Sequence, residues 1–115
     1  DGTCIRDYIY VVDLAKAHVK AMTRVLDTDS DKLEVFNIGT GKGVSTKEIV
    51  DAFEKATGVK LNWTFAPRRP GDIEKVWANP DKANNVLGWK AETSLEDTLK
   101  SAWNWQKKLR EEGIQ

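Results

Sequence analysis

Apolar side chains fill every position from residue 8 to residue 12, and all of them are aromatic or β-branched. Such a run predicts a strand over residues 7–12 that is covered on both faces, as in an α/β sheet. A second strand is predicted over residues 33–38, just before a glycine-rich loop. Every other residue from 59 to 65 is apolar, which is the period of a strand with one buried face. The pattern therefore predicts three short strands.

Apolar residues at three- and four-residue spacing, together with capping residues, predict about four helices. Asp13 is the expected N-cap of the first helix. The second has the clearest signals, because Ser45 and Glu48 form a capping box and Gly58 suits the end of the helix. Short strands mixed with about four helices predict one small α/β domain over residues 1–115. The expected helices cover residues 13–27, 45–58, 79–88 and 94 onward.

The composition is that of a globular domain with balanced charge. Hydrophobic residues make up 40% of the chain, and 18 basic residues balance 18 acidic ones, so no net field attracts nucleic acid or an anionic membrane. No apolar run approaches the roughly 18 residues that a membrane span requires. One cysteine, Cys4, cannot form an internal disulfide, which predicts a reducing, cytoplasmic location. Because the chain enters strand-like sequence directly after Asp1, without a methionine, we expect a piece of a longer protein.

Neither a metal site nor a dinucleotide-binding loop is predicted. His18 falls on the apolar stripe of the first helix, which predicts an interior histidine, and no second histidine completes a metal site. The glycine-rich residues 39–43 follow a predicted strand, but Val44 stands where the dinucleotide fingerprint needs its third glycine. A tight connection between a strand and a helix uses the same residue types. No residue of this loop is therefore predicted to bind a cofactor.

The charged turn at residues 68–72 (Arg-Arg-Pro-Gly-Asp) is the strongest candidate for a binding site. Guanidinium groups pair bidentately with phosphate oxygens, and a nearby carboxylate can accept two sugar hydroxyls. The residues by themselves leave open a solvated turn whose charges bind nothing. Arg6, next to Asp7, by itself indicates no more than an ion pair at the mouth of a strand.

Several short motifs stand along the chain in a recognisable order and spacing. Residues 1–15 with His18-Val19, and the loop Ala66-Pro-Arg-Arg-Pro-Gly-Asp72, are the most specific of them. Together the motifs resemble the C-terminal, substrate-binding part of UDP-glucose (UDP-galactose) 4-epimerases, which belong to the extended, Rossmann-type short-chain dehydrogenase group. The resemblance covers essentially the whole chain. The remaining motifs are residues 37–41, 77–80, 87–89 and 103–106.

The resemblance implies roles for the candidate residues. Arg6 and Arg69 would hold the diphosphate of UDP-galactose or UDP-glucose, and Asp72 would accept the ribose hydroxyls. The family oxidises the sugar C4 hydroxyl with tightly held NAD and returns the hydride to the opposite face, usually as a homodimer. The predicted substrate-binding set is Arg6, Arg69, Pro70, Gly71, Asp72 and Val76.

The cofactor loop and the Tyr-x-x-x-Lys catalytic pair of that family are absent from this sequence. We therefore predict no catalytic residue here, and an inactive chain without an N-terminal NAD-binding Rossmann domain. The resemblance places Val76 at a position beside the sugar where that family varies between bulky and small side chains. The small valine therefore implies acceptance of UDP-N-acetylglucosamine. Two alternatives stay open: part of another nucleotide-sugar epimerase or dehydratase, and a non-catalytic binding module.

Overall fold

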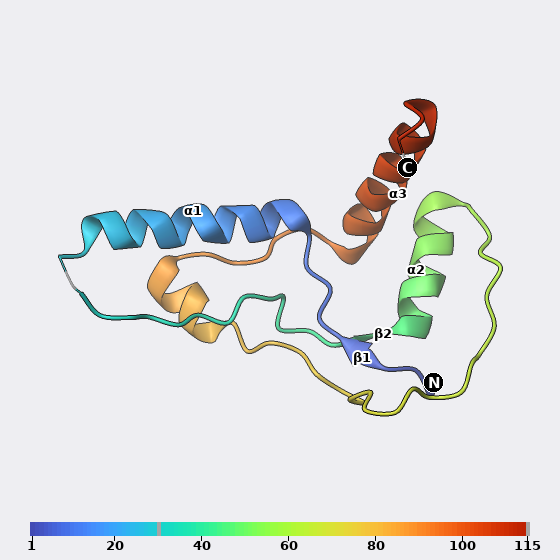
Figure 1. Cartoon of the computed structure of the whole chain (residues 1–115), viewed down its shortest axis with the longest axis horizontal. Coiled ribbons are helices and arrows are strands. Elements are labelled where there is room, and N and C mark those ends of the chain that lie inside the picture. Colours follow the sequence, from blue (N-terminus) through green and yellow to red (C-terminus); the bar gives the residue numbers. More distant parts are fainter. Residues whose placement is uncertain (30, 115) are drawn as a thin grey trace.

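The computed structural model describes residues 1–29 and 31–114, and within them helices lie at the two ends of a thin centre. Figure 1 shows α1 above the short helix η1 at one end, α2 beside α3 at the other, and the β1–β2 pair between them. This mixture of helices and very short strands confirms the predicted class. The elements in order are β1 (Ile5–Arg6), α1 (Val11–Asp27), β2 (Val44–Ser45), α2 (Thr46–Thr57), η1 (Ala83–Leu87) and α3 (Leu95–Glu111).

Local capping fixes the limits of α2 and the start of α3. The Ser45 hydroxyl accepts the backbone N–H of Glu48 at 3.1 Å, and the Glu48 carboxylate accepts the backbone N–H of Ser45 at 2.7 Å. Gly58 ends α2 with a φ of 71°, in the left-handed region that glycine adopts without strain. Ser94 caps α3 by accepting the backbone N–H of Asp97 at 3.1 Å. The predicted capping box, the end of the helix at Gly58 and the predicted start of the last helix at residue 94 are confirmed.

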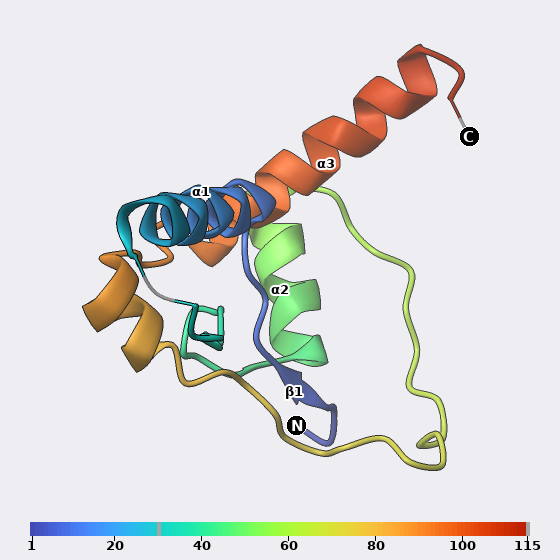
Figure 2. The same ribbon diagram turned by 60° about the vertical axis from the view of Figure 1, so that its left-hand side comes forward.

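The buried core is small and lies between α1 and η1. Its buried hydrophobic residues are Ala17, Ala83, Leu87 and Trp89. The radius of gyration is 17.4 Å, whereas a compact chain of this length would have one of about 13 Å. Figure 2 shows the reason, because α3 extends away from the body and the segment after α2 runs along the outer edge. Many apolar side chains outside this core are therefore exposed to solvent.

The strand predicted over residues 7–12 is wrong, because α1 already begins at Val11 with Tyr10 as its N-cap. Asp13, the predicted cap, lies in the first turn and is 3% exposed. Its carboxylate accepts the backbone N–H of Thr93 at 3.0 Å, and its carbonyl accepts the indole N–H of Trp89 at 2.8 Å. The aspartate is used by residues that lie far along the chain, and local sequence gives no sign of that.

The strands predicted over residues 33–38 and 59–65 are also wrong, because neither segment pairs with another strand among the described residues. Side chains hold the first one instead. Arg24 donates to both carboxylate oxygens of Glu34 at 2.6 and 2.9 Å, and Lys82 donates to the carbonyl of Val35 at 2.9 Å. A strand needs a neighbour for its backbone groups, and the alternating pattern cannot say whether one is present.

Two further expectations about helices change. The third helix consists of two α-helical residues, 81–82, followed by the π-helix η1, and Gly88 ends it with a φ of 62°. His18 is exposed, so its predicted interior position is wrong. The helix α1 buries Ala17 and packs Ala21 against the core, whereas the exposed His18 has Nδ1 2.9 Å from the carbonyl of Leu14 in its own helix. Within the described part of the chain, no helix is long and apolar enough to span a membrane.

Candidate functional site

The centre of the molecule is built on β1, which has a neighbour on each side. On one side Arg6 pairs antiparallel with Val44 of β2. On the other side Ile5 forms a parallel bridge to Lys75, with its N–H donating to the carbonyl of Glu74 at 2.9 Å and its carbonyl accepting the N–H of Val76 at 3.1 Å. These bonds place Arg6 beside the loop that precedes residue 74.

Three of the predicted site residues meet at this place. Nη2 of Arg6 lies 3.8 Å from Oδ1 of Asp72, and Arg69 donates through Nε and Nη2 to the two oxygens of the same carboxylate at 3.0 and 3.2 Å. The hydrogen bond to Asp72 is the main cause that raises the pKa of Arg69 above its ordinary value. One carboxylate therefore holds two guanidinium groups, which leaves the cluster with one net positive charge.

The turn between the two partners explains how Arg69 reaches Asp72. The N–H of Asp72 donates to the carbonyl of Arg69 at 3.2 Å, and Gly71 has a φ of 84°, which a residue with a side chain rarely adopts. Pro70 precedes it and fixes the first half of the turn. Pro70 and Gly71 thus shape the loop, and no side-chain group of theirs can donate a hydrogen bond.

The cluster is open to solvent, so a ligand can reach it. The Arg69 side chain is 83% exposed, whereas those of Arg6 and Asp72 are 32% and 21% exposed. Exposed ion pairs contribute little stability, so Arg69 can turn from Asp72 to an incoming anion at low cost. The arrangement suits a ligand with a diphosphate and adjacent hydroxyl groups.

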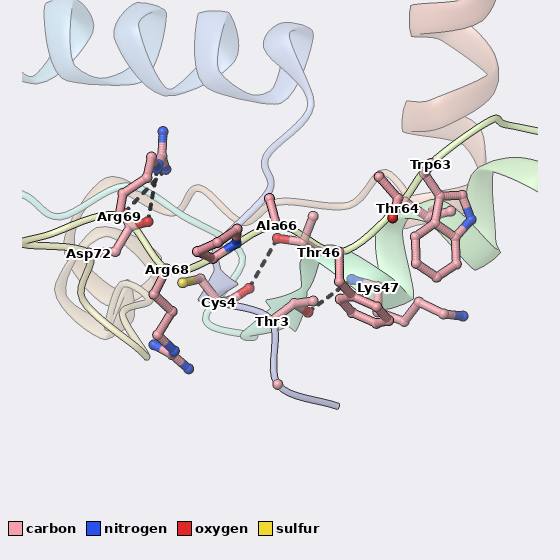
Figure 3. A pocket seen from close by; sticks show the side chains of 14 residues that line it. Thr3, Cys4, Thr46, Lys47, Trp63, Thr64, Ala66, Arg68, Arg69 and Asp72 are labelled. Carbon is pink, nitrogen blue, oxygen red and sulfur yellow. Dashed lines mark hydrogen bonds and ion pairs between the residues drawn. The ribbon is translucent and has the colours of Figure 1, made fainter.

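A pocket of about 350 Å³ opens beside this cluster, and Figure 3 shows its lining. Trp63 and Phe65 form part of the wall with their rings edge to face, 5.3 Å between centroids, and Nζ of Lys47 lies 5.2 Å from the Trp63 ring. We did not predict Trp63 or Lys47 as site residues. The alternation over residues 59–65 placed Trp63 and Phe65 on one face, which was the available signal.

Val76 lies apart from this pocket. It is 46% exposed and lines a second hollow together with Arg6, Trp77 and Ala78. Arg6 does not line the first pocket, and Asp72 does not line the second. The structure therefore brings Arg6, Arg69 and Asp72 together and places Val76 on the far side of Arg6.

The glycine-rich loop does not fit a dinucleotide. The N–H groups of Thr40 and Gly41 donate to the carboxylate of Asp7 at 2.9 to 3.1 Å, so they are already occupied by an anion from the chain itself. The described residues also contain no group of three or more His, Cys, Asp or Glu side chains that could hold a metal ion. Cys4 is a half-buried free thiol that lines the first pocket.

Known proteins are similar to this chain over most of its length. A family model described as GDP-mannose 4,6 dehydratase matches residues 1–102. Probable UDP-arabinose 4-epimerase 1 of Oryza sativa subsp. japonica is 50% identical over 111 residues, which are 96% of this chain and 26% of that protein. The UDP-glucose 4-epimerase of Bacillus subtilis (strain 168) is 50% identical over 106 residues, which are 92% of this chain and 31% of that protein.

A solved structure supports the same relation. The UDP-glucose 4-epimerase from Bifidobacterium longum in complex with NAD+ and UDP has a TM-score of 0.86 at 47% identity, over 94% of this chain and 31% of that one. The resemblance and the fold inferred from the sequence are thereby confirmed. The chain spans about a quarter to a third of the length of these relatives.

Proposed function

The chain belongs to the family whose model is described as GDP-mannose 4,6 dehydratase, and from this premise we propose that it is the C-terminal, nucleotide-sugar-binding part of an NAD-dependent UDP-glucose 4-epimerase. The observation that carries the proposal is the meeting of Arg6 with Arg69 and Asp72, although Arg6 lies more than 60 residues before both of them in the sequence. The family match and the identity to 4-epimerases from plants and bacteria support it.

We assign the diphosphate of the UDP-sugar to Arg6 and Arg69 and the ribose hydroxyls to Asp72. Charge-assisted hydrogen bonds of this kind are about twice as strong as neutral ones and fix orientation when they are bidentate. Such an anchor holds the ligand through parts that do not react, so the sugar remains free to present either face to the chemistry. An epimerase needs that freedom, because the same carbon loses and regains hydrogen from opposite sides.

Hydride transfer would be supplied by NAD, which the Bifidobacterium longum structure contains. The glycine-rich loop of this chain does not fit the cofactor, since the N–H groups of Thr40 and Gly41 are occupied by the Asp7 carboxylate. We therefore assign NAD and the catalytic residues to an N-terminal Rossmann domain of a longer protein and give this chain the role of substrate anchor.

Apolar surface on α1 supports the proposal that such a domain packs here. Val11, Val19 and Met22 are 69%, 57% and 57% exposed, and Val25 and Leu26 are 74% and 77% exposed. These side chains are spread over the length of α1, from its first turn to its last, and Figure 1 shows that α1 is one long, unbroken helix. Water contact with so many apolar side chains is unfavourable, which favours a partner surface. A homodimer of the full-length enzyme and a cytoplasmic location remain predictions from the sequence.

The sugar is proposed to be galactose or glucose, and two further sugars, arabinose and N-acetylglucosamine, are to be tested. The rice relative is named for UDP-arabinose and the Bacillus relative for UDP-glucose, and their identity to this chain is equal, at 50%. The UDP part is common to both. We also propose that UDP-N-acetylglucosamine is accepted, because Val76 has a small side chain and lines an open hollow beside Arg6. Selectivity of this kind is only about 1–3 kcal/mol.

The proposal is tested on the full-length protein and on the 115-residue chain side by side. We expect the full-length protein to convert UDP-galactose to UDP-glucose, and the 115-residue chain to show no turnover even with added NAD. Turnover by the short chain would overturn the assignment of the catalytic residues. A full-length protein that acts on none of the UDP-sugars, or that makes a 4-keto-6-deoxy product, would instead favour a dehydratase or a binding module.

A further inference from the structure

The carboxylate of Asp7 is the most heavily hydrogen-bonded side chain near the site. Its Oδ1 accepts the hydroxyl of Thr40 at 2.6 Å and the N–H of Thr40 at 2.9 Å. Its Oδ2 accepts the N–H of Gly41 at 3.1 Å and that of Ala78 at 3.3 Å. One side chain thus joins three segments: the end of β1, the glycine-rich loop, and the residues that follow the site loop.

The glycine-rich loop is shaped to receive this carboxylate. A Cβ atom added to Gly39 would lie 2.5 Å from Oδ2 of Asp7 and 2.7 Å from Cβ of Ala78, so a larger residue could not stand there without a shift. Backbone N–H groups that converge on one point form a favourable place for an anion. In this protein that place is filled from within by Asp7.

The arrangement has a consequence for Arg6. Asp7 is its neighbour in sequence, yet the carboxylate is satisfied by backbone and hydroxyl donors, and the guanidinium of Arg6 lies 3.8 Å from Asp72 instead. At 3.8 Å that pair is too long for a hydrogen bond, so it holds the guanidinium only loosely. Arg6 is held more firmly by its own strand, where Nη1 donates to the carbonyl of Ile5 at 2.8 Å, and Asp7 ties the end of that strand to the neighbouring segments.

We propose that Asp7 is a positioning residue of the UDP-sugar site. By tying Ala78 and the loop at Thr40–Gly41 to the end of β1, it fixes the wall at residues 76–78 beside Arg6 and keeps its own charge away from that guanidinium. Asp7 touches no ligand itself. The inference rests on the proposed function, because it takes the cluster of Arg6, Arg69 and Asp72 as the binding site.

The test compares four variants of the full-length enzyme with UDP as the probe. Thr40→Val removes the hydroxyl donor and keeps the shape, Thr40→Ser restores a hydroxyl, and Asp7→Asn replaces one acceptor by a donor. Thr98→Val is the matched control, because the Thr98 hydroxyl donates only within α3, to the carbonyl of Ser94 at 2.8 Å. The measurements are the Kd for UDP by calorimetry, bound NAD by absorbance, kcat and KM, and the Tm.

We expect Thr40→Val to raise the Kd for UDP and the KM about three- to tenfold, and Asp7→Asn to raise them more, since small displacements of binding groups weaken oriented binding. Bound NAD and the Thr98→Val control should not change, and Thr40→Ser should recover the parent affinity. The measurements are made well below the Tm of each variant. If Asp7→Asn does not fold, the Thr40 pair decides alone.

Two results would overturn the inference. If the variants lower the Tm but bind UDP within about twofold of the parent, or if Thr40→Ser does not restore affinity, Asp7 serves the fold alone. If the parent enzyme itself binds no UDP, the proposed function fails and this inference fails with it. The parent measurement comes first, so the two failures are distinguished.

Discussion

Replacing Asp72 by Asn separates the two interactions that this carboxylate makes, because they change ligand affinity in opposite directions. In the free protein the carboxylate pairs with the guanidinium groups and competes with any anion for them. Two charges about 4 Å apart interact with roughly 1 kcal/mol in water, so its loss should tighten binding of inorganic pyrophosphate about fivefold. In the proposed complex the same carboxylate accepts two ribose hydroxyls.

The ribose contacts should make the variant bind UDP more weakly. Hydrogen bonds to a charged group contribute about 1.5–3 kcal/mol each, and the Asn side chain, with one acceptor oxygen in place of two, loses one of the two ribose contacts. After the gain of roughly 1 kcal/mol at the guanidinium groups, the net loss for UDP is about 0.5–2 kcal/mol, or about 2- to 30-fold in Kd. The sign for pyrophosphate and the sign for UDP therefore differ.

Calorimetric titration of the full-length enzyme with both ligands measures the two effects, and competition between them shows that they share a site. Asp97→Asn is the matched control, since Asp97 lies in the first turn of α3, away from the cluster. We expect it to leave both affinities unchanged. If Asp72→Asn weakened both ligands equally, or tightened UDP as well, the assignment of Asp72 to the ribose would be wrong.

Three further predictions concern stability and can be followed by urea unfolding or Tm. Trp89→Phe should cost about 1–3 kcal/mol, through the lost hydrogen bond and the void, whereas the exposed Trp105→Phe should change stability by less than about 0.5 kcal/mol; equal effects would contradict the small core. Gly39→Ala should cost about 1–3 kcal/mol by overpacking at the 2.5 Å contact, and a neutral result would show that the neighbours move freely. Hydrogen bonding to Arg24 lowers the pKa of Glu34, so this pair stabilises the fold above the ordinary carboxyl pKa and loses its effect as the pH falls through the lowered pKa. Glu34→Gln should therefore make the Tm depend less on pH below about pH 5. A variant whose Tm falls with pH as steeply as that of the parent would refute the coupling.

The sequence predicted best where the interaction is local. The capping box of Ser45 and Glu48 uses atoms three residues apart, and the glycines that end α2 and η1 need only their own φ. Its period placed Trp63 and Phe65 on one face. The motif resemblance also selected Arg6, Arg69 and Asp72, which the fold then brings together.

Only the tertiary structure could decide whether an extended segment becomes a strand and which partner a charged group takes. Residues 33–38 have the composition of a strand, but ladder bonds require a second chain segment beside them. Asp13 and Asp7 look like a helix cap and a partner of Arg6, yet their acceptors are filled by Thr93 and by the loop at Thr40, 80 and 33 residues away. Hydrogen bonds between residues so far apart in the sequence depend on the tertiary fold, because the chain must first bring the two segments together. Local sequence preferences do not determine that arrangement.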